Sequence, residues 1–263
     1  MFETTQYEVS RRLRGTAILT AGVSILAVFM ISIFPSIEAS GIDLDAMIES
    51  YPPAMREAFG IETLASIEGF LAVEFYNFVW LLLIGLYFAY SAAGLIADDI
   101  EQDRMGLLLS FPVARTRLLR EKFASLLVPI LVLNAVAALV VYAGVSVIGE
   151  SIDPVSVGMV HLLSVPYLLV CAGIGLTISV LVNRAEIAKR GAIASVFVLF
   201  LVDSITAGLE ALDWLQYISP THYFDPTEIL VHGSYDLLNA ATLIVMFIAL
   251  LSVSQLLFTR RDI

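Results

Sequence analysis

Residues 123–148 read FASLLVPILVLNAVAALVVYAGVSVI, a run that contains no Asp, Glu, Lys or Arg. The hydrocarbon core of a bilayer is about 30 Å thick and takes about 20 apolar helical residues to cross. Inside lipid every backbone N–H and C=O needs a partner within the protein, so a run of this kind forms a helix. The stretch therefore predicts a transmembrane helix.

The composition extends this prediction to the whole chain. Of 263 residues, 59% are hydrophobic and only 15% are charged, whereas soluble domains are about 45–50% apolar and about 25% charged. Five further apolar blocks are long enough to cross a bilayer, although one of them is short and contains Asp203. We expect an all-α polytopic membrane protein with one domain over residues 1–263. The six predicted spans are about 15–34, 71–97, 123–148, 155–182, 192–208 and 237–258.

The basic residues predict the orientation of these spans. Thirteen of the 14 Lys and Arg residues lie in segments 1–14, 98–122, 183–191 and 259–263. Because cytoplasmic loops are enriched in Lys and Arg, both termini are expected in the cytoplasm. The first apolar run is longer than that of a signal peptide and is interpreted as a retained span. Residues 3–14 are expected to form a short amphipathic helix on the inner surface.

The net charge of −11 indicates an acidic protein with few lysines. This balance suggests adaptation to strong salt, as in a halophilic archaeon. It also argues against nucleic-acid binding, which needs a clustered basic surface.

Two outer segments are too long to be simple connectors. Segment 35–70 is interpreted as a cap on the first two spans, either a substrate gate or a salt-adapted lid. Segment 209–236 is rich in large apolar residues and is cut by Pro220 and Pro226. It predicts two short helices that dip into the outer leaflet. His222 and His232 match no metal-ligand spacing, so no metal site is expected.

The inner segment 98–122 joins an acidic start, a leucine-rich stretch and a proline break. An acidic start suits a helix N-terminus, and Pro112 ends one helix and can begin the next. The segment is either a surface helix anchored by its arginines or a docking site for another protein.

No nucleotide-binding or hydrolytic motif is present in the sequence. It has no G-x-x-x-x-G-K-[ST], no H-E-x-x-H and no G-x-S-x-G. We therefore expect neither an enzyme nor a bound cofactor in this chain alone.

The inner segment resembles that of the type-2 ABC transporter permeases. The resemblance rests on IADDIE at residues 96–101, followed by LLLSFPVARTRLL at residues 107–119. ISPTHYFDP at 218–226 and FTRRD at 258–262 also resemble family segments. The similarity covers the whole chain and is greatest to haloarchaeal versions, although Met105-Gly106 replaces the usual Gly-Thr pair.

The resemblance implies a half-transporter. Two permeases, expected to be identical copies, pair in the cell membrane, and each docks a separate ATP-binding subunit that holds ATP and Mg. Residues 3–14 correspond to the family's surface elbow, and residues 209–236 to its outer re-entrant helices. The resemblance assigns the ATPase-coupling contact to Asp98, Asp99, Glu101, Asp103, Arg104, Leu107, Leu108, Pro112 and Arg115. It assigns a secondary ATPase contact to Arg184, Glu186 and Lys189.

Polar residues within the predicted spans are candidates for a substrate path, because charges inside a membrane are costly and often functional. These are Asp203, Glu74 and Asn77. Asp203 either lines the path, pairs across the dimer or is wetted from the outer surface. Asn134 and His161 are expected to form interhelical hydrogen bonds.

The predicted function is the permease subunit of an ATP-driven exporter, and the alternative is an ATP-independent ion-coupled carrier or channel. The sequence does not indicate the substrate.

Overall fold

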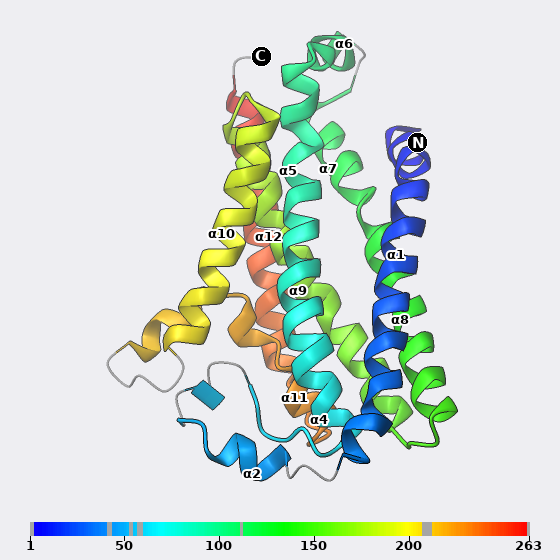
Figure 1. Cartoon of the computed structure of the whole chain (residues 1–263). Coiled ribbons are helices and arrows are strands. Elements are labelled where there is room, and N and C mark those ends of the chain that lie inside the picture. Colours follow the sequence, from blue (N-terminus) through cyan, green and yellow to red (C-terminus); the bar gives the residue numbers. More distant parts are fainter. Residues whose placement is uncertain are drawn as a thin grey trace.

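A computed structural model describes residues 3–40, 44–52, 55–56, 60–110, 113–206 and 212–261. Within these ranges the chain is helical and contains no strand, which confirms the all-α prediction. The long helices run side by side, with short helices at both ends of the bundle (Figure 1).

The helices follow one another in a simple order. They are α1 (Glu3–Glu38), α2 (Leu44–Glu49), α4 (Ile67–Leu71), the π-helix η1 (Ala72–Ile84), α5 (Gly85–Glu101), α6 (Arg104–Ser110), α7 (Arg115–Ala124), α8 (Leu127–Val147), α9 (Pro154–Leu181), α10 (Ala185–Thr206), the 3₁₀ helices η2 (Asp213–Ile218) and η3 (Thr221–Tyr223), α11 (Pro226–Leu230) and α12 (Leu237–Arg260).

Among the described residues, five helical stretches, two of them made of consecutive helices, are long and apolar enough to cross a membrane. They are Thr5–Glu38, Ile67–Glu101, Arg115–Val147, Pro154–Leu181 and Leu237–Arg260. They match the first four predicted spans and the last one. The fifth predicted span lies in α10, a 22-residue helix that also carries Lys189, Arg190 and Asp203. With these charged residues, α10 has too many charges to be counted as a membrane-spanning helix on composition alone. The sixth crossing therefore stays a prediction.

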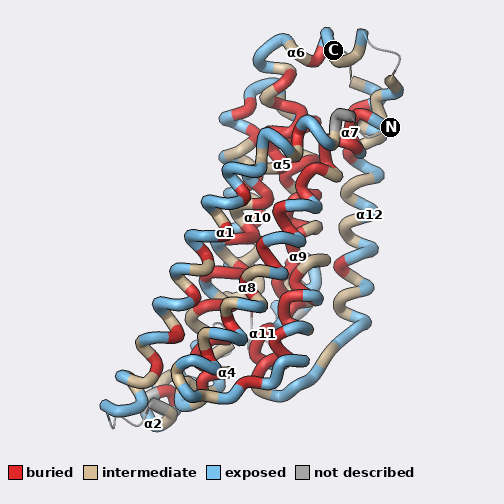
Figure 2. Tube along the Cα trace, turned by 90° about the vertical axis from the view of Figure 1, so that its right-hand side faces the viewer, coloured by how far each residue is buried: buried red, intermediate tan, exposed pale blue. Residues whose placement is uncertain are grey.

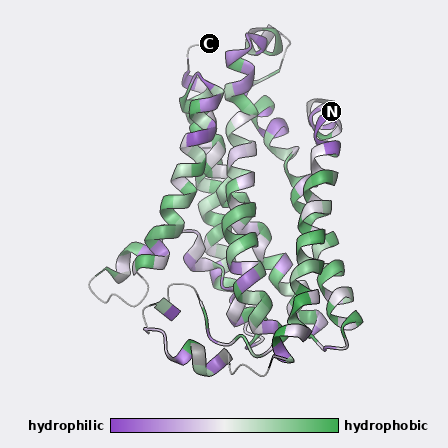
Figure 3. Cartoon of the chain, in the orientation of Figure 1, coloured by the Kyte–Doolittle hydropathy of each residue, from purple (hydrophilic) through white to green (hydrophobic). Residues whose placement is uncertain are grey.

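Helix α9 lies at the centre of the bundle and packs against α5, α8, α10 and α12. Buried residues line the interior, and exposed residues face outward along the whole length of the bundle (Figure 2). Many of the outward residues are large and apolar, such as Leu139 and Val245. Hydrophobic residues form the middle of the bundle and hydrophilic residues gather toward its ends (Figure 3). This distribution is that of a protein whose outer face meets lipid.

Small residues bring α5 and α9 close together. A Cβ atom built on Gly175 would collide with the backbone carbonyl of Ala89. One turn further along α9, Ser179 Oγ accepts hydrogen bonds from the backbone N–H groups of Ile96 and Ala97, both at 3.0 Å. Small side chains of this kind allow membrane helices to approach closely.

A buried polar cluster joins η1, α8 and α9 within the bundle. His161 Nδ1 lies 3.3 Å from Asn134 Oδ1, and Tyr76 Oη lies 3.0 Å from His161 Nε2. Ser164 Oγ donates to Asn134 Oδ1 at 2.8 Å. The predicted interhelical hydrogen bonds of Asn134 and His161 are therefore confirmed.

The predicted inner segments meet at one end of the bundle. The start of α1, the end of α12, α6 and α7 lie together at this end, and α2, α4 and α11 lie at the opposite end (Figure 1). These ends are here called the inner and the outer end, after the predicted orientation. Charged side chains connect the inner segments across long sequence separations, such as Lys122 to Glu8 and Lys189 to Asp98.

Residues 3–14 do not form the separate surface helix that the sequence predicted. Helix α1 runs without interruption from Glu3 to Glu38. Its first turns are held against α7, because Thr5 Oγ1 donates to the Glu121 carbonyl at 3.0 Å and Glu8 pairs with Lys122. No proline stands between these turns and the apolar part of α1, so the helix continues.

Candidate functional site

The inner end of α5 differs from the sequence-based expectation. Residues 98–101 were predicted to open a new helix, but they form the last turn of α5, which ends at Glu101. Carboxylates at a helix C-terminus are unfavourable with respect to the helix dipole. The structure offsets this cost by giving Asp98, Asp99 and Glu101 separate partners from other helices.

Asp99 is the centre of an ion cluster, here called the inner ion cluster, formed by Glu8, Asp99, Lys122 and the partly exposed Arg104. Lys122 Nζ lies 2.5 Å from Asp99 Oδ2 and 2.8 Å from Glu8 Oε1. Arg104 Nη2 lies 2.7 Å from Asp99 Oδ1. The side chains of Lys122, Asp99 and Glu8 are only 3%, 6% and 10% exposed. The cluster thus ties α1, α5, α6 and α7 together at the foot of α6.

Asp98 and Glu101 tie α5 to α10. Lys189 Nζ donates to both Asp98 carboxylate oxygens, at 2.8 and 3.0 Å. Glu101 Oε2 accepts a hydrogen bond of 2.9 Å from the backbone N–H of Ala185, the first residue of α10. A carboxylate at a helix N-terminus is favourable with respect to the dipole. Arg184 and Glu186 beside it are exposed, and Glu186 pairs with Arg190.

The turn between α5 and α6 depends on Asp103. This residue has a φ of 53°, and it is the one described non-glycine residue with a positive φ. Asp tolerates this left-handed conformation better than most residues, and a left-handed residue is a common end to a helix. The turn ends α5 at Glu101 and allows α6 to begin at Arg104.

Helix α6 presents apolar residues at the tip of the inner end. Leu107 is 69% exposed, Leu108 and Leu109 are half-buried, and Met105 is buried against the core. Figure 1 shows α6 beyond the ends of the long helices. Pro112, also a predicted coupling residue, lies outside the described residues. Arg115, at the start of α7, donates to the carbonyls of Phe258 and Arg261 and so faces the end of α12.

A pocket of about 580 Å³ lies near the outer end, between η1, α10 and the short helices η2 and η3. Its lining brings together all three predicted substrate-path residues, Glu74 and Asn77 from η1 and Asp203 from α10. Sequence reasoning missed His222 and Asp225, which complete its polar wall. His222 Nδ1 lies 3.9 Å from Asp203 Oδ1.

Residues of the π-helix η1 form one wall of this pocket. Residues 73, 77 and 81 and residues 74, 78 and 82 line it in two columns, each with a spacing of four. A π-helix forms i→i+5 hydrogen bonds, is rare, and occurs frequently at functional sites. The opposite side of η1 is buried, with Tyr76, Val79 and Trp80 in the core.

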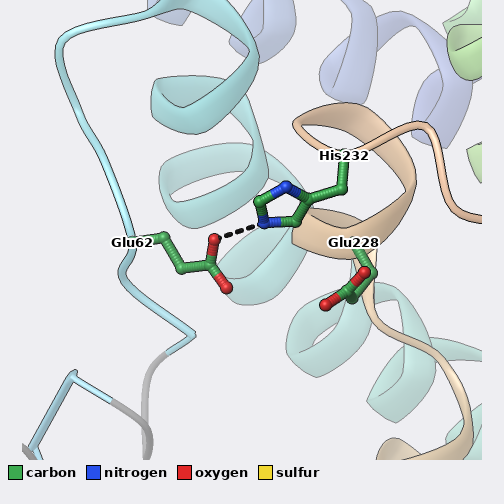
Figure 4. A group of neighbouring side chains, drawn as sticks. All are labelled: Glu62, Glu228 and His232. Carbon is green, nitrogen blue, oxygen red and sulfur yellow. Dashed lines mark hydrogen bonds and ion pairs between the residues drawn. The ribbon is translucent and has the colours of Figure 1, made fainter.

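A contact between Glu62 and His232 joins the segment before α4 to the residues that follow α11. His232 Nε2 lies 2.6 Å from Glu62 Oε2, and Glu228 is close by (Figure 4). The hydrogen bond to Glu62 raises the pKa of His232 above its usual value. The ligand-type atoms of the three residues lie within 4.8 Å of one another, and all three residues are exposed. A hydrogen bond of 3.1 Å from Thr227 Oγ1 to the Gly60 carbonyl joins the same two segments, which indicates a structural tie.

Comparison with known proteins identifies the family. A family model described as ABC-2 family transporter protein matches residues 6–263. The comparison with curated proteins finds no match to this chain. The match covers the long helices, the inner ion cluster, α6 and the outer pocket in one continuous stretch. The chain therefore belongs to the ABC-2 transporter family, as the membrane subunit of an ABC system.

Proposed function

We propose that the chain is the permease subunit of an ATP-driven exporter and that α6 is the element through which a separate ATP-binding subunit drives it. The family match over residues 6–263 supports the transporter role. The observation that supports the coupling role is the exposed apolar tip of α6, which is anchored at its base by the inner ion cluster.

Seven of the nine predicted coupling residues divide into two groups under this proposal; Arg115 contacts the end of α12 instead, and Pro112 lies outside the described residues. Leu107, Leu108 and Asp103 form the contact with the ATPase, because they lie on or beside the protruding helix. Asp98, Asp99, Glu101 and Arg104 transmit the movement, because each is paired with another helix or with the inner ion cluster. Arg184 and Glu186 lie at the start of α10 and form the secondary contact, together with Lys189, which also pairs with Asp98.

The remaining parts of the proposal follow from the same assignment. The end that carries α6 faces the cytoplasm of the cell, so both termini are cytoplasmic. A second copy of this chain completes the transport path, and α10 forms the sixth crossing. ATP and Mg are held by the partner subunit. A change of contacts at α6 between two states of the ATPase would then shift the permease between two conformations.

Co-purification tests the coupling role. The chain would be expressed with any ABC ATPase encoded next to it in the genome and purified in a mild detergent. Leu107→Asp is expected to lower the recovered ATPase at least about tenfold, because a carboxylate would be buried in an apolar contact. Leu107→Met is the matched control and is expected to retain the complex, because it keeps an apolar side chain of similar size.

Two results would contradict the proposal. One is equal recovery of the ATPase with both Leu107 variants, which would place the contact elsewhere. The other is a wild-type chain that binds no ATPase and moves ions by itself in liposomes, which would favour an ATP-independent carrier or channel.

A further inference from the structure

The outer pocket has the size of a small-molecule site. Its volume of about 580 Å³ lies within the range of about 300–1,000 Å³ typical of ligand pockets. Its walls come from η1, α10, η3 and the segment around Gly60, which are far apart in the sequence. It lies at the outer end of the helices that would form the transport path.

The polar part of this lining is acidic. Glu74, Asp203 and Asp225 contribute three carboxyl groups, and no Lys or Arg is found among the described residues of its lining. Asp225 Oδ1 accepts the backbone N–H groups of Thr227 and Glu228 at the start of α11, so this oxygen is already engaged. Asp203 lies beside His222, which carries a charge only when it is protonated. A cation in the pocket would gain from carboxylates that are partly shielded from water.

The rest of the lining is apolar and aromatic. Phe78, Phe200 and Phe224 line the pocket together with leucines of η1. Phe224 is buried and stacks on Tyr167, with ring centroids 5.9 Å apart, so its position is fixed. Aromatic faces attract organic cations and also bury apolar groups. A hydrated metal ion would neither fill this volume nor gain from such walls.

We propose that this pocket binds an organic cation with an apolar body, such as a quaternary ammonium or phosphonium compound or a protonated hydrophobic amine. The inference deepens the proposed function, because such a cation would be the class of substrate that the permease moves. The carboxylates of Asp203 and Glu74 hold the charge, and the phenylalanine side chains hold the apolar body.

Direct binding to the permease tests this inference. The purified chain in lipid nanodiscs would be dialysed to equilibrium against radiolabelled tetraphenylphosphonium, with empty nanodiscs as the blank. Saturable binding is expected for the wild type. Asp203→Asn and Glu74→Gln are each expected to raise the Kd about tenfold, which corresponds to about 1.4 kcal/mol. Both substitutions keep the shape of the side chain and remove its charge.

Two controls separate the pocket from general effects. Glu150→Gln removes one negative charge from the loop between α8 and α9 and is expected to leave the Kd within about twofold, because Glu150 does not line the pocket. Tetraphenylborate has nearly the same shape as the phosphonium probe but carries a negative charge. It is expected to show no saturable binding that depends on Asp203.

Several outcomes would overturn the inference. These are the absence of saturable phosphonium binding, equal saturable binding of the borate, or an equal loss of affinity in all three variants. ATPase co-purification is measured in parallel on the wild type and the same variants, co-expressed with the ATPase. ATPase binding without phosphonium binding would reject the cation site and leave the coupling role intact. Phosphonium binding without ATPase binding would reject the coupling role alone.

Discussion

At the scale of single residues, the two lysines of the chain have the same kind of partner but different surroundings. Lys189 pairs with Asp98 and is 22% exposed, whereas Lys122 pairs with Asp99 and Glu8 and is 3% exposed. Removing one partner of a buried ion pair leaves an uncompensated charge in a poor solvent, which is far more costly than losing an exposed pair.

We expect Lys122→Met to lower the free energy of unfolding by about 3 kcal/mol, because two buried carboxylates would lose their shared cation. Lys189→Met is the matched control, with an expected loss of about 1 kcal/mol or less. Denaturant titration of both variants in the same detergent measures the difference. Adding Glu8→Gln to Lys122→Met should recover part of the stability. Equal losses in the two lysine variants would show that the deeper burial of Lys122 does not make its ion pairs more important for stability than that of Lys189.

The residue scale is also where sequence reasoning was least complete. The acidic residues 98–103 were identified by their resemblance to a family signature, but the partners of Asp99 were not. Glu8 and Lys122 are separated by 114 positions, and no local spacing pattern connects them. The only signal for Lys122 is its rarity, since it is one of two lysines among 14 basic residues.

At the scale of helices, hydropathy was sufficient to locate five spans, because about 20 apolar residues in a row have few alternatives to a membrane helix. The residues at which the helices end were harder to predict. The second span was expected to end at 97 and continues to Glu101, because charged partners from α7 and α10 stabilise four more residues. The π-helical stretch Ala72–Ile84 has no recognisable signal in the sequence.

Helix packing gives the second prediction. Gly175→Ala is expected to destabilise the protein by about 1–3 kcal/mol, because the new methyl group collides with the Ala89 backbone and forces α5 and α9 apart. Gly158→Ala lies in the same helix with nothing within 4 Å of the new Cβ. It is expected to be neutral or to stabilise by up to about 1 kcal/mol, since alanine favours helix. The two melting temperatures, measured side by side, check this; a similar shift in both would contradict a close contact at Gly175.

At the scale of the whole molecule, the charged segments predicted to share one side of the membrane do meet at one end of the bundle (Figure 1). That arrangement followed from counting arginines and lysines, because the positive-inside rule needs no knowledge of packing. The outer pocket, in contrast, could not be predicted from the number or position of charged residues in the sequence. Its residues come from positions 60–82, 200–204 and 216–226, and only the folded chain brings them together.

The third prediction concerns the crossing of α10. In a Cys171→Ala background, single cysteines would replace Ser110, Ser151, Glu186 and Ser234 and be labelled in intact cells with a membrane-impermeant maleimide. Positions 151 and 234 are expected to react in intact cells, and positions 110 and 186 only after permeabilisation. Labelling of 186 and 234 from the same side would mean that α10 does not cross the membrane.

The depth of the inner ion cluster also determines how this end of the protein responds to ionic strength. The Debye length falls from about 10 Å at 0.1 M salt to about 3 Å at 1 M, which weakens exposed pairs such as Arg190 with Glu186. Lys122 and Asp99 are each almost fully buried, so salt screens their attraction much less. The ion cluster beneath α6 is therefore expected to weaken less in concentrated brine than the exposed charges on the surface of the same molecule.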